Sequence, residues 1–442
     1  MAWAIFLCVW RQGKESGIAK DFYDPGSGND LSAQAKSMKI LSVVGARPNY
    51  MKVAPIVSAI KEKNRRQRRR ITHVLVHTGQ HYDSELSDVF FVDLKLPKPK
   101  YYLGVGSGSH AIQTAEVLKK FEAVLGLEKP DVVMVVGDVN STLACALVAS
   151  KTFYDNRGSR PLIAHVEAGL RSFDRGMPEE INRVLTDHLS DFLFVTEPSG
   201  VLNLVREGIA RERIHFVGNT MIDCLLACLK QAGRSRILER LGLREYGVPG
   251  PKTATIPFAV LTLHRPSNVD DPKNFLNIIQ TLEEVAASLP IIFPCHPRTK
   301  NNIVRFGYQS HFVYLGDDDA SPGSGADFLR TDHPRHSINL VHSLSYLDFL
   351  RLMSSAAIVL TDSGGIQEET TVLKIPCITL RENTERPITV SQGSNIVAGT
   401  DKERILAAFR SQSRAKTRRT QPRLWDGRAS RRIVDIITGT LG

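Results

Sequence analysis

Three acidic residues in the first half of the chain could move a proton together: Asp138, Glu167 and Glu179. Each also has an ordinary structural explanation. Asp138 could cap the helix that follows it. Arg171 could neutralise Glu167, and Glu179 could pair with Arg183 one helical turn away. As a set on one side of a cleft, however, such carboxylates are what is needed to remove and return a proton while a leaving group departs.

Two turns of small residues, one in each half of the chain, are suited to binding an anion. Gly45 ends an apolar segment, and Arg47 and Lys52 follow it in a predicted helix. Residues 363–365 (Ser-Gly-Gly) open another helix after an apolar segment, where bare backbone N–H groups favour a diphosphate. The alternatives are a plain turn with two surface cations and a small-residue helix cap.

Three more side chains follow predicted strands in the second half of the chain. His264 comes directly after one strand, and Arg386 follows another and adds a cation. Glu369 lies one turn inside the helix that begins near Gly365, about where a carboxylate could accept hydrogen bonds from ribose hydroxyls. A single histidine is more often structural, but its place at a strand end favours a functional role.

Short apolar segments alternate with helical patterns along the chain, which predicts parallel sheets covered on both faces. The fold class is therefore α/β, with two doubly wound, Rossmann-like domains and a cleft between them. In such sheets ligands bind at the carboxyl ends of the strands, where the side chains above occur. Predicted strands are 39–45, 73–78, 131–137, 162–166, 192–195, 258–263, 291–294, 312–315, 357–361 and 376–380, and predicted helices include 51–60, 141–153 and 178–189.

The predicted boundaries divide the chain into four parts. Residues 1–37 are a disordered extension or precede the true start, because Met38 begins a clean strand pattern. The first domain spans 38–218 and the second 219–415, with a loop-rich insertion at 316–341. Residues 416–442 form a basic terminal helix that could pack back on the first domain.

Composition excludes several classes of protein. With 442 residues, 42% of them hydrophobic and 23% charged, the chain is neither collagen-like nor wholly disordered. No apolar run is long enough to span a membrane. The net charge of +11 comes largely from basic runs that are better explained as solvated surface than as a nucleic-acid site. Six scattered cysteines without C-x-x-C spacing indicate reduced thiols in a cytoplasmic protein.

Taken in order, the motifs resemble those of the non-hydrolysing UDP-N-acetylglucosamine 2-epimerases. The resemblance covers the chain from about Met38 to the C-terminal tail. The matching motifs are Gly45-Ala-Arg-Pro with Lys52, Thr78-Gly-Gln-His81, Gly137-Asp138, His165-Val-Glu167-Ala-Gly-Leu-Arg171, Pro178-Glu-Glu-Ile-Asn-Arg183, Asp362-Ser-Gly-Gly-Ile-Gln-Glu-Glu369 and Thr384-Glu-Arg386-Pro. Ordered motifs at near-family spacing are far more specific than any one of them.

The resemblance implies a fold like that of the GT-B nucleotide-sugar glycosyltransferases and an active site in the cleft. It implies UDP-GlcNAc to UDP-ManNAc interconversion without NAD or metal, usually by a homodimer, supplying a sugar nucleotide for cell-surface polysaccharide. Carried over by motif, the catalytic residues are Asp138, Glu167, Glu179 and His264. The UDP-sugar contacts are Arg47, Lys52, Asp138, Glu167, His264, Phe349, Ser363, Gly364, Gly365, Glu369 and Arg386.

The chain also departs from the family pattern. Asn49 stands where members frequently have an acidic residue, and Tyr82-Asp83 follows Gln80-His81 where many bacterial members have a second Gln of an activator site. Activation by a second UDP-GlcNAc is therefore left open. The alternatives are a sister enzyme acting on a UDP-2,3-diacetamido-uronic acid, a hydrolysing relative, a glycosyltransferase, and a nucleic-acid-binding protein using Arg65–Arg70 and the tail.

Overall fold

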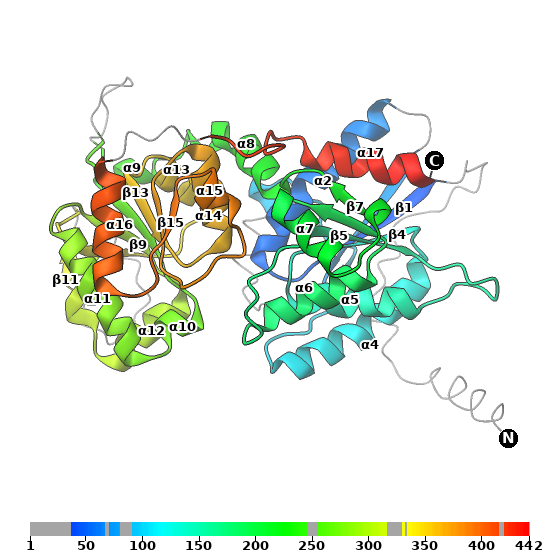
Figure 1. Ribbon diagram of the computed structural model, residues 1–442, viewed down its shortest axis with the longest axis horizontal. Coiled ribbons are helices and arrows are strands. Elements are labelled where there is room, and N and C mark those ends of the chain that lie inside the picture. The colour runs from blue at the N-terminus through cyan, green and yellow to red at the C-terminus, as the bar shows by residue number, and fades with distance from the viewer. Residues whose placement is uncertain are drawn as a thin grey trace.

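The computed structural model describes residues 37–66, 70–79, 91–244, 255–315, 329–331, 334–414 and 420–441, and these form two parallel sheets with helices packed around them (Figure 1). The predicted α/β fold with two doubly wound units is confirmed. The extension 1–36 and the segment 80–90, with the Gln80–Asp83 motif, lie outside the described residues.

The first sheet has seven strands in the order β3-β2-β1-β4-β5-β6-β7. Its strands are β1 (Met38–Val44), β2 (Ile71–His77), β3 (Tyr101–Tyr102), β4 (Val132–Val136), β5 (Leu162–Ala168), β6 (Phe192–Val195) and β7 (Ile214–Phe216). Its helices are α2 (Arg47–Arg66), α4 (His110–Glu128), α5 (Asn140–Lys151), α6 (Pro178–Leu189) and α7 (Pro198–Arg206), with a short 3₁₀ turn at Arg211–Arg213. The predicted helix 178–189 and strand 192–195 are confirmed to the residue.

The second sheet has eight strands in the order β11-β10-β12-β9-β8-β13-β14-β15. They are β8 (Ala259–Thr262), β9 (Ile291–Pro294), β10 (Phe312–Leu315), β11 (Leu329–Thr331), β12 (Ile338–Val341), β13 (Ile358–Thr361), β14 (Cys377–Thr379) and β15 (Asn395–Val397). The helices of this half are α9 (Ile237–Arg240), α10 (Pro266–Val269), α11 (Pro272–Ala286), α12 (Pro297–Phe306), α13 (Tyr346–Ser354), α14 (Gly364–Leu373), α15 (Ile388–Ser391) and α16 (Lys402–Arg414), with a 3₁₀ turn at Gln309–His311.

The prediction that 316–341 is one loop-rich insertion is wrong at its end. Residues 338–341 form β12, which pairs with β10 on one side and β9 on the other, well inside the sheet. Asn339 lies fully buried in this strand, and its amide donates to the backbone oxygens of Arg335 and Ser337. A polar residue in a four-residue strand interrupts the run of apolar residues, so the sequence pattern did not predict this strand.

In both sheets the strand order reverses beside the first strand, and this switch point marks where a ligand can bind. The order changes direction between β1 and β4 in the first sheet and between β8 and β13 in the second. At such a point the following connections diverge to opposite faces and leave a crevice beyond the strand ends. The segments after these four strands carry Lys52, Asp138, His264 and Ser363.

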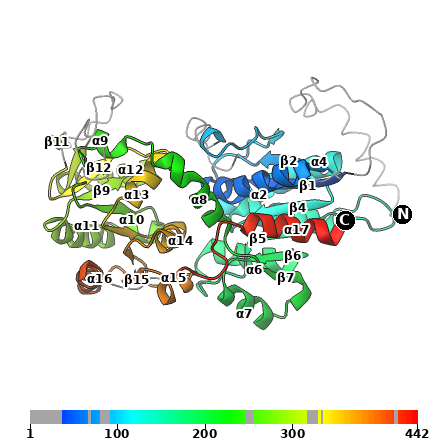
Figure 2. The same ribbon diagram turned by 90° about the horizontal axis from the view of Figure 1, so that it is seen from above.

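Two helices join the halves of the molecule. α8 (Thr220–Ala232) packs on both α2 and α13, and α17 (Ala429–Leu441) returns to lie along α2 (Figure 2). Trp425 precedes α17, is fully buried, and donates its indole N–H to the carbonyl of Thr196. None of the described helices is long and apolar enough to cross a lipid bilayer.

Candidate active site

Glu167 lies at a β-bulge near the end of β5. Val166 pairs with Phe194 and Ala168 with Val195, so Glu167 is the extra residue between them. Its φ of 77° is in the left-handed region, which costs a residue with a side chain about 1–3 kcal/mol. Bulges re-aim a side chain, and such strain persists where the surrounding contacts hold it. The direction of this carboxylate is therefore imposed by the fold.

Two buried cations from different halves of the chain contact the Glu167 carboxylate. Lys52 Nζ on α2 lies 2.8 Å from Oε2, and Arg386 Nη2, between β14 and α15, lies 3.2 Å from Oε1. The expectation that Arg171 is the partner of Glu167 is wrong, because Arg171 contacts Asp187 and Glu207 instead. Glu167 thus joins the two halves of the molecule through charge.

Arg386 is the centre of this interdomain cluster. Besides Glu167, its Nε lies 2.7 Å from Glu368 Oε1 and its Nη1 lies 2.9 Å from Glu385 Oε1. Burial alone would lower the pKa of Arg386, but these carboxylates raise it well above its ordinary value. A Cβ on Gly364 would lie 2.3 Å from Arg386 Nη1, so a glycine is required where α14 begins beside the guanidinium.

Asp138 follows β4 and faces the same cluster. Its Oδ2 accepts from Arg183 Nη2 at 2.7 Å and from Arg183 Nε at 3.1 Å. Burial alone would raise the pKa of Asp138, but Arg183, Lys52 and Arg386 lower it below its usual value. The explanation of Asp138 as a helix cap is wrong, because Val139 occupies the N-cap position of α5 and no side chain caps that helix.

The two glutamates at the start of α6 have different surroundings. Glu180 is buried and accepts hydrogen bonds from the backbone N–H groups of Ser172 and Phe173. It also contacts Arg183, so the pairing expected between Arg183 and Glu179 is made with Glu180. Glu179 lies half-buried in the first turn of α6, next to Glu180, which binds the loop containing Ser172 and Phe173.

The turn after β1 is shaped by Asn49. Its side-chain oxygen accepts from the N–H groups of Gly45 and Ala46, both at 3.0 Å, and its amide donates to the carbonyl of Val136 at 3.1 Å. A carboxylate here could accept the first two bonds but could not donate the third. Asn49, in the place of an acidic residue, therefore connects this turn to β4 by a hydrogen bond. Arg47 begins α2, and its side chain lies outside the described part of the structure.

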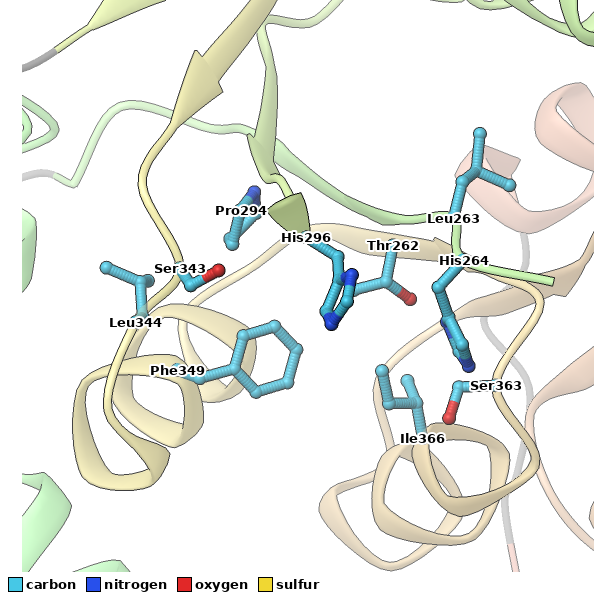
Figure 3. Close-up of a pocket in the computed structure, with 10 residues that line it drawn as sticks. All are labelled: Thr262, Leu263, His264, Pro294, His296, Ser343, Leu344, Phe349, Ser363 and Ile366. Atoms are coloured by element: carbon cyan, nitrogen blue, oxygen red, sulfur yellow. The ribbon is translucent and has the colours of Figure 1, made fainter. Parts of the chain in front are cut away.

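A second group of predicted residues lines a pocket of about 200 Å³ in the second half of the chain (Figure 3). Phe349 reaches it from α13 and Ser363 from the start of α14, with His264 directed toward Ser363. His264 Nδ1 lies 3.0 Å from Asp362 Oδ1, and the backbone N–H of His264 donates to Asp362 Oδ2. Burial alone would raise the pKa of Asp362, but these donors lower it, so an anionic Asp362 aims the half-exposed His264.

Glu369 lies in α14, behind the start of the helix that Gly364 and Gly365 form. It is 3% exposed, and the hydroxyl of Tyr346 donates to its Oε1 at 3.0 Å. Burial raises the pKa of Glu369 to about 7, although the Tyr346 bond acts in the opposite direction. The carboxylate therefore changes charge near neutral pH.

The structure brings Lys52, Asp138, Glu167 and Arg386 into one cluster, and places His264, Phe349 and Ser363 around one pocket. Gly364 connects the two, since it adjoins both Ser363 and Arg386. Glu368 and Glu385 were not predicted as partners of Arg386. Both lie inside the motifs shared with the epimerases, but nothing in a linear pattern indicates which glutamate faces a given arginine.

This arrangement has the parts needed for acid–base chemistry beside a departing anion. Glu167, from the first half of the chain, lies next to Lys52 of the same half and next to Arg386 of the second half, which adjoins the start of α14. Positive charge and backbone N–H groups at a helix start stabilise phosphate oxygens. No group of His, Cys, Asp and Glu side chains suited to a metal ion occurs among the described residues.

Comparison with known proteins agrees with this geometry. The family model described as UDP-N-acetylglucosamine 2-epimerase matches residues 63–438. The chain is 41% identical over 403 residues to the Methanocaldococcus jannaschii UDP-N-acetylglucosamine 2-epimerase, covering 91% of this chain and 99% of that protein. It is 35% identical over 404 residues to the Pseudomonas aeruginosa UDP-2,3-diacetamido-2,3-dideoxy-D-glucuronate 2-epimerase, covering 90% and 99%.

Solved structures give the same picture. The crystal structure of the M. jannaschii enzyme in complex with UDP-GlcNAc and UDP superposes with a TM-score of 0.76 at 40% identity, covering 91% of this chain and all of that one. A glycosyltransferase of kitacinnamycin shares the fold alone, with a TM-score of 0.50 at 10% identity, covering 92% of this chain and 100% of that one. The likeness to a nucleotide-sugar glycosyltransferase fold is thereby confirmed.

Proposed function

The chain belongs to the UDP-N-acetylglucosamine 2-epimerase family and is an isomerase, and on that premise we propose that it interconverts UDP-GlcNAc and UDP-ManNAc without hydrolysis. The observation that carries this proposal is Glu167, a carboxylate set on a strained bulge and held between Lys52 and Arg386 at the junction of the two halves. A fixed carboxylate beside cations that also serve the leaving group is suited to elimination.

The proposed reaction is an anti-elimination followed by addition. Glu167 takes the proton from C2 of the sugar, the C2–H electron pair becomes the C1–C2 double bond, and the C1–O bond breaks with its electrons leaving on UDP. UDP oxygen then adds back to C1 of the glucal while Asp138 or Glu179, protonated from solvent, delivers a proton to the opposite face of C2. Glu167 then releases to solvent the proton that it took, which returns the site to its starting state. The proton at C2 is not activated by a carbonyl, so stabilisation of the leaving group must supply much of the barrier reduction.

The second half of the molecule is proposed to hold the nucleotide. Ser363 and the N–H groups of Gly364 and Gly365 would receive the diphosphate at the start of α14. His264, aimed by Asp362, would donate to a departing phosphate oxygen. Glu369 would accept the ribose hydroxyls, and Phe349 would lie on the uracil side.

Retention of UDP decides between epimerisation and hydrolysis. The contact of Arg386 with Glu167 connects the two halves at the site, while Glu368 and Glu385 hold Arg386 within the second half. A site held closed in this way would keep the glucal and UDP together, because both must remain in place for the addition step. We therefore favour the non-hydrolysing outcome, with the sugar nucleotide supplied to cell-surface polysaccharide.

A second candidate substrate is UDP-2,3-diacetamido-2,3-dideoxy-D-glucuronate. The observation in its favour is the P. aeruginosa relative, which matches nearly the whole chain at 35% identity. Both substrates share UDP and a 2-acetamido group at the epimerised centre, so the same acid–base residues would serve either.

The test is proton NMR of the protein with UDP-GlcNAc in deuterated water. Epimerisation would give UDP-ManNAc with deuterium at C2, whereas free ManNAc with UDP would indicate a hydrolase. Glu167→Gln should fold and lose exchange by about 10²–10⁴-fold, because an amide does not accept the proton. The matched control is Glu382→Gln, which alters a side chain that is 65% exposed and paired with Arg404. Normal turnover by Glu167→Gln would refute the proposal, and turnover of only the uronic acid would select the second substrate.

We also propose that the protein works as a homodimer in the cytoplasm. The five cysteines in the described part of the chain, all buried, are free thiols, as a reducing compartment requires. Light scattering of the purified protein would give the mass of two chains if the dimer forms, and that of one chain if it does not.

A further inference from the structure

A buried ionic cluster lies directly behind the two proposed acid–base carboxylates. His165 is on β5, two residues before Glu167, and is fully buried. Its Nδ1 lies 2.6 Å from Asp187 Oδ1 on α6, and its Nε2 lies 2.9 Å from the carbonyl oxygen of Gly137. Gly137 immediately precedes Asp138. One imidazole ring therefore touches the segments that carry Asp138, Glu167 and the helix of Glu179.

Hydrogen-bond accounting fixes the protonation of this ring. A backbone carbonyl can only accept, so Nε2 must carry a hydrogen to approach Gly137 at 2.9 Å. Asp187 accepts at its other oxygen from Gly169 N–H at 3.1 Å and from Arg171 Nη2 at 2.7 Å. The Arg171 guanidinium, 2.7 Å from Oδ2, stabilises the ionised form of Asp187, so its other oxygen also acts as an acceptor. Nδ1 must then carry a hydrogen as well, and the ring is an imidazolium.

The charges around the ring balance only in that state. Asp187 from α6, Arg171 from the segment after β5, and Glu207 at the end of α7 are the charged groups linked in this cluster. Arg171 is bound by both carboxylates, through Asp187 at 2.7 Å and Glu207 at 2.6 Å. With His165 charged, two cations meet two anions, whereas a neutral ring would leave Arg171 shared between the fully buried Asp187 and the partly exposed Glu207.

We infer that His165 is a positioning residue, whose doubly hydrogen-bonded ring holds the Gly137–Asp138 turn at a set distance from the bulge that carries Glu167. From β5, the His165 ring hydrogen-bonds to the Gly137 carbonyl after β4 and to Asp187 on α6. Asp187 also accepts from the backbone N–H of Gly169, two residues beyond Glu167. In the elimination proposed above, on which this role rests, the acid and the base must face opposite sides of C2. The ionic cluster fixes the distance between the acid and the base through the backbone segments that carry them, and it does not contact the sugar.

The state of the ring is tested by long-range ¹H–¹⁵N NMR of the full chain labelled with ¹⁵N-histidine. A neutral histidine carries a proton on only one ring nitrogen. We expect both ring nitrogens of His165 to carry a proton in the native protein, with the signal assigned by its loss in His165→Gln or its displacement in Asp187→Asn. A ring nitrogen without a proton would overturn the inference whatever the substrate proves to be.

The positioning role is tested by kinetics of the same variants. We expect His165→Gln to lower kcat about 30-fold with KM changed less than about threefold, since the nucleotide site is intact and only the acid–base geometry shifts. Asp187→Asn should behave alike and replaces it if His165→Gln does not fold. The control is Arg160→Gln, which breaks a partly exposed pair with Asp191 at the other end of β5 and should leave kcat unchanged. A kcat within twofold of the parent in a folded variant would refute positioning, while absence of exchange in the parent would refute the proposed function instead.

Discussion

A single methyl group added behind Lys52 tests whether the cation–carboxylate geometry matters for turnover. Gly137 has a φ of 70°, and a Cβ there would lie 2.7 Å from Lys52 Nζ. The Lys52 ammonium would have to retreat by about 0.7 Å to reach the ordinary contact distance of 3.4 Å, which disturbs its 2.8 Å ion pair with Glu167. Misplacements of about this size cost up to about 10²-fold in rate. We expect Gly137→Ala to lower kcat by about 10–100-fold, a barrier increase of about 1.4–2.8 kcal/mol.

The stability cost can be separated from the catalytic one with a matched glycine. The left-handed backbone itself costs alanine about 1–2 kcal/mol, and displacing the buried Lys52 from its ion pair with Glu167 adds to that cost. Gly158 has a φ of 84° and nothing within 4 Å of its added Cβ, so Gly158→Ala carries the strain alone. Urea unfolding should show a larger loss for Gly137→Ala than for Gly158→Ala, and C2 deuterium exchange should fall only in Gly137→Ala. Equal exchange rates in the two variants would refute the argument.

Three further predictions concern the interdomain cluster, the nucleotide site and the C-terminal segment. Arg386→Lys should lower both stability, by about 3–5 kcal/mol in urea unfolding, and exchange at C2, because one ammonium cannot contact three buried carboxylates. The affinity for UDP measured by calorimetry should rise from pH 6 to pH 8, since the pKa of Glu369 is about 7 and the ionised form accepts the ribose hydroxyls, and Glu369→Gln should flatten this change. Because that folded pKa lies above the ordinary 4.5, the free protein should lose stability as pH rises from 4.5 to 7. Trp425→Ala should cost about 3–5 kcal/mol in thermal or urea unfolding, because a fully buried indole and its bond to Thr196 are lost.

Local patterns determined much of the fold. The apolar run 192–195 and the helical pattern 178–189, opened by Pro178, depend on residues next to one another, and both elements appear with those bounds. The rule that ligands bind at strand ends then led to Asp138, His264 and Ser363, since each follows an apolar strand directly. These features need no knowledge of distant contacts.

Other features were invisible because their cause lies far away in the chain. The bulge at Glu167 depends on how β5 pairs with β6, and a left-handed φ at a glutamate contradicts its local preference. The short strand β12 was hidden because the buried Asn339 is satisfied by backbone groups that only the folded chain brings to it. Propensity is a weak guide wherever tertiary contacts reverse it.

By itself the sequence determined which chemical groups the protein has and at which strand ends they occur, because strand ends and helix starts are local properties. Only the tertiary structure decided which charges meet. Arg386 and Glu167 are 219 residues apart, and nothing between them predicts a 3.2 Å contact. Arg171 was the nearest cation in sequence, but it is drawn to Asp187 and Glu207 instead. Ion pairing depends on distance in space and on burial, and both are set by how the two sheets pack together.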